Sequence, residues 1–359
     1  MELTEAEFEK RHLMGENFLQ SVEMYRRYKA MGREAYLVGV KDDMGEIVAK
    51  GLISGRNWRL GKKLFRVPGG WLMDYDGKNW GEVLEFLTKK TLTFCREKGG
   101  IVIEIAPNIT SQPRDGKNQV ISEKNYLDVK AKLVELGYKY LGEYEQPKWE
   151  YYLEIEGKTP EELFKDFRNG HKWEIRRAER DGVRVRELGL DELTILKKIT
   201  AESGERHGFH EPEVEYYRSM KKFFGEKVKF VVAEIPAEKL KADGIELEKG
   251  LEYVPLAASM FLNDGREMIY LYSGSVRALQ RYGGAHLIQW KMMQEAIKSG
   301  CKVYNFYGTR PVEGNGVYRF KQGFRGHVEE LLGTFALPVG WLGRIYVGRL
   351  KTREFSEIE

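Results

Sequence analysis

The stretch from Gly316 to Gly326, near the C-terminus, combines residue types that could bind and stabilise an anion. Phe320 and Phe324 lie four residues apart, Lys321 stands between them, and Arg325 follows them. Glycines at both ends permit tight backbone turns. The two aromatic rings could anchor in a core while the basic side chains point at an anion. The alternative is a basic turn whose aromatic residues only pack.

A second stretch, residues 171–186, is the densest basic segment of the chain. Its candidate nucleic-acid-binding residues are Lys172, Arg176, Arg177 and Arg180. Arg176 and Arg180 are four apart, so a helix would present both on one face. Such a face could contact phosphate groups. It could also be a solvated helix face on which Glu174 and Glu179 pair with their basic neighbours.

A third stretch, Gln280 to Ala285, precedes an amphipathic segment and resembles the Q-x-x-G-x-A loop of acyl-CoA-dependent N-acetyltransferases. In that loop, backbone N–H groups at a helix start hold a pyrophosphate. A plain helix-entry loop would have the same sequence.

Other catalytic patterns are weak or absent from the sequence. Asp74 and Glu104 are the carboxylates that could act as a base, and each could equally be a turn or capping residue. The six histidines lack metal-type spacing and neither cysteine has a close partner, so no metal site is predicted. The sequence contains neither a G-x-S-x-G motif nor a Walker loop.

Length and composition indicate a globular protein with room for two domains. The chain has 359 residues, 42% of them hydrophobic and 32% charged, with a net charge of +4. That small excess of positive charge does not by itself indicate nucleic-acid binding. The two cysteines, an acidic N-terminus without an apolar signal core, and the lack of about 18 consecutive apolar residues predict a cytosolic protein.

The expected elements give each half of the chain a similar plan of strands, a long helix, a glycine and one more strand. In the first half we expect helices over 4–32, 80–98 and 124–136 and strands over 35–40, 47–53 and 101–105. In the second half we expect helices over 161–180, 190–204, 211–224 and 284–299 and strands over 150–155, 228–234, 254–262, 267–273 and 302–306. This order predicts an α+β protein of two similar domains, with residues 236–252 as an exposed excursion.

Several stretches also occur in the order and spacing typical of one family. They are Phe18-Leu19-Gln20-Ser21 with Lys29, Val67-Pro68-Gly69-Gly70 with Asp74-Tyr75, Gln146-Pro147, residues 175–183, Glu205-Arg206 with Tyr216-Tyr217, Tyr304-Asn305-Phe306, and Gly316 to Phe324. From the first to the last they span some 300 residues. Through them the chain resembles the Fem-type (FemABX) peptidyltransferases, the peptidoglycan interpeptide-bridge aminoacyltransferases of Gram-positive bacteria.

The resemblance implies a fold of two N-acetyltransferase-like (GNAT-like) domains. The first would comprise residues 1–148 plus 318–359 and hold the acceptor nucleotide, and the second would comprise 149–317. Many relatives carry a helical hairpin in the second domain, but only 236–252 stands in that place here, so this chain resembles the members without it. The implied activity is transfer of Ala, Ser or Gly from aminoacyl-tRNA to the stem-peptide amine of UDP-MurNAc-pentapeptide or lipid II. No cofactor is implied.

The resemblance also assigns roles to particular residues. Catalysis is implied for Lys321, which would stabilise the oxyanion or contact the acceptor end of the tRNA, with Phe320 shaping its site. Binding of the acceptor is implied for Lys29, Arg206, Tyr216, Tyr270, Tyr272 and Asp74. The basic segment becomes the expected tRNA contact. One departure stands out: the family's Asp-Phe-Gly-Gly stretch is replaced by Asn305-Phe306-Tyr307-Gly308, and asparagine cannot act as a base.

Residues 341–351 at the C-terminus mix apolar and basic residues. They could lie against the inner surface of the membrane, or form a terminal helix docked on the first domain. Two other functions fit parts of the chain: an acyl-CoA-dependent N-acyltransferase using the third stretch, and a non-catalytic RNA-binding module using the basic segment.

Overall fold

The computed structural model describes residues 2–115, 117–122, 125–144, 146–207, 212–248 and 250–353, without the side chains of 205–207. The chain divides into two compact units. The first comprises Met1–Glu150 and Val328–Glu359, and the second comprises Tyr151–His327. Residues 318–327, which contain Lys321, therefore belong to the second unit, whereas the sequence-based division placed them in the first.

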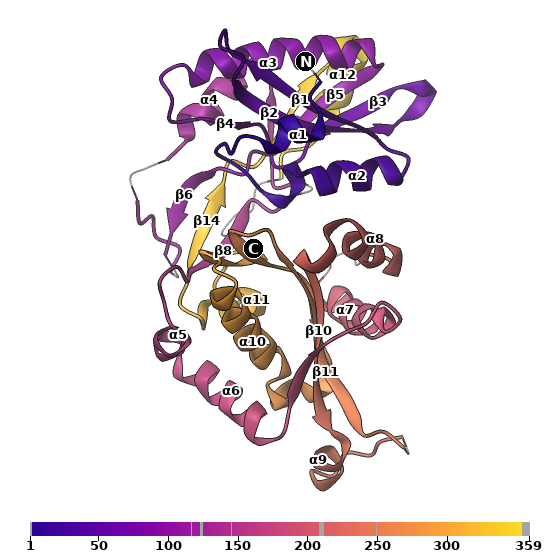
Figure 1. The fold of residues 1–359 in the computed structure, drawn as a ribbon, viewed down its shortest axis with the longest axis vertical. Helices are drawn as coiled ribbons and strands as arrows, with labels where there is room; N and C mark the ends of the chain where they lie inside the picture. Colours follow the sequence, from indigo (N-terminus) through magenta and orange to yellow (C-terminus); the bar gives the residue numbers. More distant parts are fainter. Residues whose placement is uncertain are drawn as a thin grey trace. The chain divides into compact units, whose positions relative to one another are not determined.

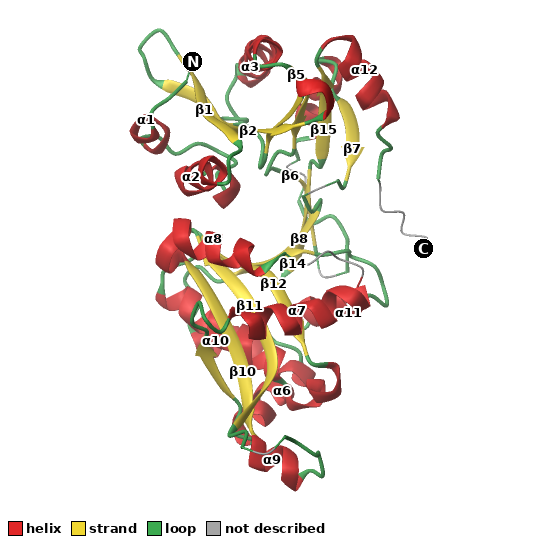
Figure 2. Ribbon diagram, turned by 90° about the vertical axis from the view of Figure 1, so that its right-hand side faces the viewer, coloured by secondary structure: helices red, strands yellow, loops and turns green. Residues whose placement is uncertain are grey.

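The first unit is built on a mixed sheet with the strand order β1-β2-β3-β5-β15-β7, and β4 pairs with β2. Figure 2 shows β1, β2, β5, β15 and β7 of this sheet. Its strands are β1 (Glu34–Lys41), β2 (Ile47–Asn57), β3 (Lys63–Val67), β4 (Leu72–Met73), β5 (Gly100–Ile105), β7 (Lys139–Gly142) and β15 (Thr334–Pro338). β6 (Thr110–Arg114) is not part of this sheet and pairs with β14 (His327–Leu331). Because β15 lies between β5 and β7, the end of the chain completes the sheet begun by the N-terminal half.

Helices cover both faces of this sheet. They are α1 (Glu5–Glu9), α2 (Val22–Ala30), α3 (Trp80–Glu97), α4 (Leu127–Glu135) and α12 (Gly340–Arg349), with the short 3-10 turns η1 (Phe18–Gln20) and η2 (Arg59–Gly61). Leu87 of α3 and Leu133 of α4 share a core with Ile103, whereas Val347 of α12 packs with Val102. Adjacent residues of a strand point to opposite faces, so α3 and α12 sandwich β5 (Figure 2).

A second sheet contains the strands of the second unit in the order β8-β13-β12-β11-β10-β9. Its strands are β8 (Trp149–Glu154), in which the chain enters the unit, β9 (Arg184–Glu187), β10 (Val228–Pro236), β11 (Tyr253–Asn263), β12 (Glu267–Ser275) and β13 (Val303–Gly308). Its helices are α5 (Pro160–Asp166), α6 (Asn169–Arg180), α7 (Leu193–His207), α8 (Val214–Phe224), α9 (Ala237–Ala242), α10 (Gly284–Lys298) and α11 (Gly316–Gln322), with η3 (Gly225–Lys227) and η4 (Arg277–Tyr282). Figure 1 shows α6 and α10 on one side of β10 and β11, and α7 and α8 on the other.

Strand β12 contains a β-bulge close to the point where it separates from β13. Phe261 of β11 lies opposite Tyr270, but the preceding Met260 lies opposite Tyr272, so β12 has one extra residue. The parallel pairing between β12 and β13 ends at Asn305. Carbonyl groups of β13 beyond that residue need other donors, because buried backbone polar groups are rarely left unpaired.

Two segments differ from their sequence-based predictions. The helix expected over 161–180 is divided into α5 and α6, because Phe167 leaves the helical path to become buried against Phe324 and the N–H of Arg168 donates to the Gly323 carbonyl. Within 236–252, the described residues form α9 with a fully buried Leu240 instead of a wholly exposed excursion.

The close approach of α12 to β5 gives a stability prediction. A Cβ atom added to Gly343 would lie 2.0 Å from the Ile101 carbonyl oxygen, so Gly343→Ala should lower the free energy of unfolding by at least about 2 kcal/mol. Gly348 of the same helix has no atom within 4 Å of such a Cβ, so Gly348→Ala should stabilise by about 0.5–1 kcal/mol. Denaturant unfolding of the two variants measures the contrast, and equal effects would contradict this packing.

Candidate functional site

The side chain of Lys321 occupies the end of β13. It is 4% exposed, and its Nζ donates to the carbonyl oxygens of Phe306 at 2.8 Å, Tyr307 at 3.3 Å and Gly308. An ammonium group has three donors and no acceptor, so these contacts match its full hydrogen-bonding capacity. Lys321 thus supplies donors to carbonyl groups that lie beyond the end of the β12–β13 pairing.

The backbone that Lys321 binds has an unusual conformation. Tyr307 has a φ of 59°, in the left-handed region that non-glycine residues rarely adopt. Its N–H donates to Oδ1 of Asn305 at 2.7 Å, and Asn305 in turn donates to the buried Glu267 at 3.0 Å. Such strained conformations persist only where many surrounding contacts hold the backbone in place, and they are most common at functional sites. Asn305 therefore acts as a brace, in the place where the family pattern has an aspartate.

An aromatic cluster links this strand end to the neighbouring elements. The ring of Phe306 lies 6.3 Å from Tyr270 and 5.2 Å from Phe324, and Phe324 lies 5.4 Å from Phe320. Phe324 is fully buried. Phe320 in α11 and Phe324 just after it thus pack against the second unit. This is the packing role that the sequence analysis gave as one possibility for the two rings.

Two histidines lie against this cluster. The rings of His171 and His286 are 4.7 Å apart, and each lies within 6 Å of Phe320. Nε2 of His171 is 2.8 Å from the carbonyl oxygen of Phe320. A carbonyl only accepts, so Nε2 carries the proton and Nδ1 is the acceptor nitrogen.

Burial keeps both rings neutral. Desolvation lowers the pKa of His171 and, with smaller contributions from His171 and Arg177, lowers the pKa of His286 to about 3. The neighbourhood of Lys321 therefore receives no second positive charge from these rings at neutral pH.

The lowered histidine pKa makes stability depend on pH. Between about pH 6.5 and pH 3 the unfolded chain binds protons that the folded chain excludes, so stability is complete above this window and falls as pH decreases through it. For His286 the loss from pH 7 to pH 5 should be roughly 2 kcal/mol. In His286→Gln the difference in unfolding free energy between these pH values should shrink by that amount. An unchanged difference in His286→Gln would contradict the burial of this ring as the cause.

Two of the three predicted acceptor-binding tyrosines, Tyr216 and Tyr272, lie near one another. The Tyr216 ring of α8 lies 5.5 Å from Tyr272, and Tyr270 stacks on Phe261 at 5.2 Å. Burial raises the pKa of Tyr270, so its hydroxyl is a neutral hydrogen-bonding group. The structure thus groups Tyr216 with Tyr272 beside the bulge of β12. The side chain of Arg206 lies outside the described residues.

The predicted residues of the first unit have distinct environments. Lys29 is exposed in the last turn of α2, 6.0 Å from the ring of Tyr25. Asp74 is exposed, and its Oδ1 accepts from the N–H of Asp76 at 3.1 Å, as in a turn. Glu104 is buried and accepts from Nε of Arg66 at 2.6 Å. Both carboxylates thus have structural contacts.

Helix α6 divides the predicted tRNA-binding residues into two pairs. Arg176 and Arg180 are exposed. Lys172 is half-buried and donates to the Lys165 carbonyl at 2.9 Å. Arg177 is half-buried, with its guanidinium 4.6 Å from the ring of Trp173.

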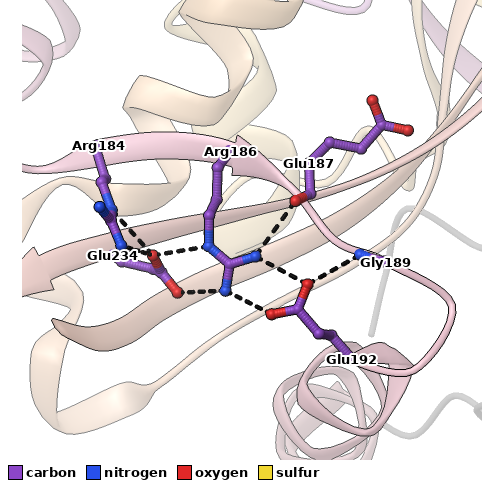
Figure 3. Close-up of polar contacts among 6 residues, drawn as sticks. All are labelled: Arg184, Arg186, Glu187, Gly189, Glu192 and Glu234. Atoms are coloured by element: carbon purple, nitrogen blue, oxygen red, sulfur yellow. Dashed lines mark hydrogen bonds and ion pairs between the residues drawn. The ribbon is translucent and has the colours of Figure 1, made fainter.

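The basic residues that follow α6 are neutralised (Figure 3). Arg186 binds both Glu234, at 2.9 Å, and Glu192, at 2.8 Å, and Arg184 also pairs with Glu234, at 3.1 Å. This network joins β9 to β10 and to the start of α7. Because their charges are compensated by Glu234 and Glu192, Arg184 and Arg186 add little to the positive charge with which this segment could bind a partner.

The Gln280–Ala285 loop is covered by α6. A Cβ atom on Gly283 would lie 2.7 Å from the carbonyl oxygen of Glu174 and 3.3 Å from its carboxylate oxygen Oε2. Gly283 and Gly284 are buried. A carboxylate beside the start of α10 would oppose a pyrophosphate there. This geometry disfavours the acyl-CoA alternative at this loop.

The sequence did not identify the two histidines, Asn305 or Trp173 as members of these surfaces. His171 and His286 meet only because α6 packs on α10. Trp173 is 52% exposed, and an exposed tryptophan within a basic segment is the one signal that sequence inspection could have used.

Comparison with solved structures identifies the class of fold. The chain is similar to the crystal structure of FemX, with a TM-score of 0.78 at 18% identity over 97% of this chain and 99% of that one. It is also similar to a tandem GNAT protein from the clavulanic acid biosynthesis pathway, with a TM-score of 0.52 at 8% identity over 86% and 84%. The prediction of an α+β fold with two GNAT-like domains is confirmed.

Sequence comparison then identifies the family. The FemAB family model matches residues 2–243 and 238–343. The chain is 27% identical over 407 residues to aminoacyltransferase FemB of Staphylococcus epidermidis, covering 94% of each. It is 22% identical over 383 residues to aminoacyltransferase FemA of Staphylococcus aureus, covering 90% of each. The chain belongs to the FemAB family and is an aminoacyltransferase, as the sequence predicted.

Proposed function

We propose that this enzyme transfers an amino acid of the Ala, Ser or Gly class from aminoacyl-tRNA to the stem-peptide amine of a peptidoglycan precursor. The acceptor is UDP-MurNAc-pentapeptide or lipid II, and the product is part of an interpeptide bridge. Family membership supports the reaction class. The observation that supports the proposed site is the hydrogen bonding of Lys321 to the carbonyl groups at the end of β13, beside the bulge of β12.

The reaction requires little beyond positioning and charge stabilisation. The amine nitrogen attacks the ester carbonyl, an oxyanion forms, and the tRNA ribose oxygen leaves and takes up the proton released by the amine. The ester is already activated, so the step consumes no ATP. In this proposal Lys321 stabilises the oxyanion, which replaces the contact of its Nζ with the Tyr307 carbonyl oxygen, at 3.3 Å. Phe320 shapes the site beside it.

The remaining predicted residues bind the acceptor in this proposal. Lys29 contacts the diphosphate, as does Arg206, and Asp74 contacts the peptide. Tyr216 of α8 and Tyr272 beside the bulge of β12 contact the acceptor, and Tyr270, which stacks on Phe261 of β11, is a further acceptor contact. The tRNA and the precursor are both made in the cytoplasm, where we place the enzyme.

The direct test is a transfer assay. Alanyl-, seryl- and glycyl-tRNA carrying a radiolabelled amino acid are each mixed with UDP-MurNAc-pentapeptide or with lipid II. The proposal expects label in one of the two acceptors. If none of the three esters labels either acceptor while CoA binds tightly by calorimetry, the acyl-CoA alternative replaces this proposal.

The role of Lys321 can be separated from its structural role. Lys321→Met should lower the transfer rate by about 100-fold or more, the cost of losing an oxyanion donor. It also leaves carbonyls of β13 without a donor, so the thermal midpoint should fall. Asn305→Ala loosens the same turn but retains the cation, and it should affect transfer far less than the thermal midpoint. An equal loss of transfer in both variants would mean that the turn, and not the ammonium, matters.

The outer face of α6 is the proposed tRNA contact. Arg176 and Arg180 supply exposed charge, and Trp173 supplies an exposed ring on which a base can stack. Lys172 and Arg177 support this face through their contacts within the protein. The combination suits the single-stranded acceptor end of a tRNA.

Loss of this face should weaken tRNA binding in a salt-dependent manner. Arg176→Gln with Arg180→Gln should lower the slope of log Kd against log salt by about 1 to 2. Each phosphate contact that is lost reduces the number of counterions released when the tRNA binds. The control pair Lys198→Gln with Lys241→Gln removes equal charge from α7 and α9, where both side chains are exposed. Filter binding at several salt concentrations measures both slopes. Equal slopes in the two double variants would place the tRNA elsewhere.

A further inference from the structure

The outward face of α12 carries apolar side chains where a surface helix normally carries polar ones. The inner face is docked on the sheet through Gly343 and Val347. Trp341 is 70% exposed and Ile345 is 47% exposed, and they are four residues apart, so they lie side by side on the outside. The docked helix predicted as one alternative is therefore present, and it leaves a large apolar pair facing outward.

A third exposed apolar residue lies at the turn between β2 and β3. Leu60 is 93% exposed, and its backbone is left-handed, with φ of 56° and ψ of 37°. Neither feature stabilises the folded unit. The left-handed conformation crowds the Cβ atom of Leu60, and its exposed side chain buries almost no apolar surface. The turn presents Leu60 outward as a single protruding apolar tip.

Both segments belong to the first unit and lie at the same end of β5. The N–H of Lys63 donates to the carbonyl of Gly99, and the N–H of Val339 donates to the carbonyl of Ile101. The rings of Trp58 and Tyr346 meet edge to face at 5.7 Å. The turn and the helix therefore form one surface, defined by Leu60, Trp341 and Ile345 with the basic residues Arg59, Lys62, Arg344 and Arg349, and called here the basic apolar face.

The charge of this face is of one sign. Residues 56–63 contain four basic residues, of which Lys63 pairs with Glu34 of β1, and residues 340–353 contain four more; neither segment contains an acidic residue. Exposed guanidinium groups among exposed apolar side chains fit a partner that is both anionic and apolar. A free phosphate lacks the apolar part, whereas a bilayer with anionic headgroups has both. Tryptophan is the side chain that favours the boundary between headgroups and acyl chains.

We propose that the basic apolar face binds the surface of an anionic lipid bilayer. The contact is peripheral, because no helix within the described ranges is long and apolar enough to cross a membrane. The insertion is shallow and involves the Leu60 tip and the Trp341–Ile345 pair, while the surrounding basic side chains contact headgroups. The membrane contact does not require the transferase assignment. Its use, to bring the enzyme to a lipid-linked acceptor, rests on the proposed function.

The test is sedimentation of the full chain with vesicles of phosphatidylcholine alone or with 30% phosphatidylglycerol. We expect binding to the mixed vesicles that weakens with salt, and little binding to phosphatidylcholine. A triple variant, Leu60→Ser with Trp341→Ser and Ile345→Ser, should lower the partition coefficient by roughly tenfold or more. Arg59→Gln with Arg344→Gln and Arg349→Gln should lower it by about a hundredfold.

The matched control replaces three exposed apolar residues of the same unit that lie outside this face. They are Met44, Phe86 and Val134, each changed to serine. The control should bind vesicles as the unmodified chain does, and circular dichroism should show all variants folded. Equal loss of binding in the control, or unchanged binding in the Leu60–Trp341–Ile345 variant, overturns the proposal. So does a concentration-dependent dimer that only this variant abolishes, because the face would then bind a second copy.

The Leu60–Trp341–Ile345 variant also tests membrane binding independently of the proposed transferase function. With the soluble acceptor and no vesicles, the triple serine variant should transfer at the unmodified rate. If the unmodified chain transfers to neither acceptor yet binds vesicles, the proposed function fails and the membrane contact stands.

Discussion

The interaction on which the second unit depends is the hydrogen bonding of one buried ammonium group to the carbonyls at the end of β13. A buried charge is costly unless it is fully hydrogen-bonded, and carbonyl groups released from a strand pair are costly unless they find donors. Lys321 meets both requirements at once. Since β12 bulges and separates from β13 at this point, the lysine allows the sheet to open without leaving its backbone unsatisfied.

Opening a sheet in this way creates a place where reacting groups can approach a backbone edge. The left-handed Tyr307, held by Asn305, fixes the shape of that edge. The aromatic rings around Phe306 exclude water from one side, and the neutral histidines add bulk without charge. A cation in a partly dry site stabilises a developing negative charge far better than the same cation in water. This arrangement suits aminolysis of an ester, in which the charge appears on a single oxygen.

The sequence predicted the elements and the class of protein well, because these depend on periodicity and on local turn residues. The run Ile101 to Ile105 and the long amphipathic helix before it are local signals, and both are found as β5 and α3. The partners of Lys321 could not be predicted, since they are backbone carbonyls whose availability depends on where β12 and β13 separate. The same holds for His171 and His286, which meet only through helix packing, and for the division of α5 from α6 at the buried Phe167.

The central claim is that the Lys321 ammonium group, beyond holding the strand end, takes part in transfer. Its 15N-detected NMR signal, assigned by its loss in Lys321→Met, tests this most directly. In the free enzyme the signal should be sharp and protected from solvent exchange, because the group is buried and hydrogen-bonded. Adding the acceptor with a non-hydrolysable amide-linked aminoacyl-tRNA should shift the signal. An unchanged signal at saturating concentrations of both substrates would show that Lys321 is a structural brace alone, and the site of transfer would lie elsewhere.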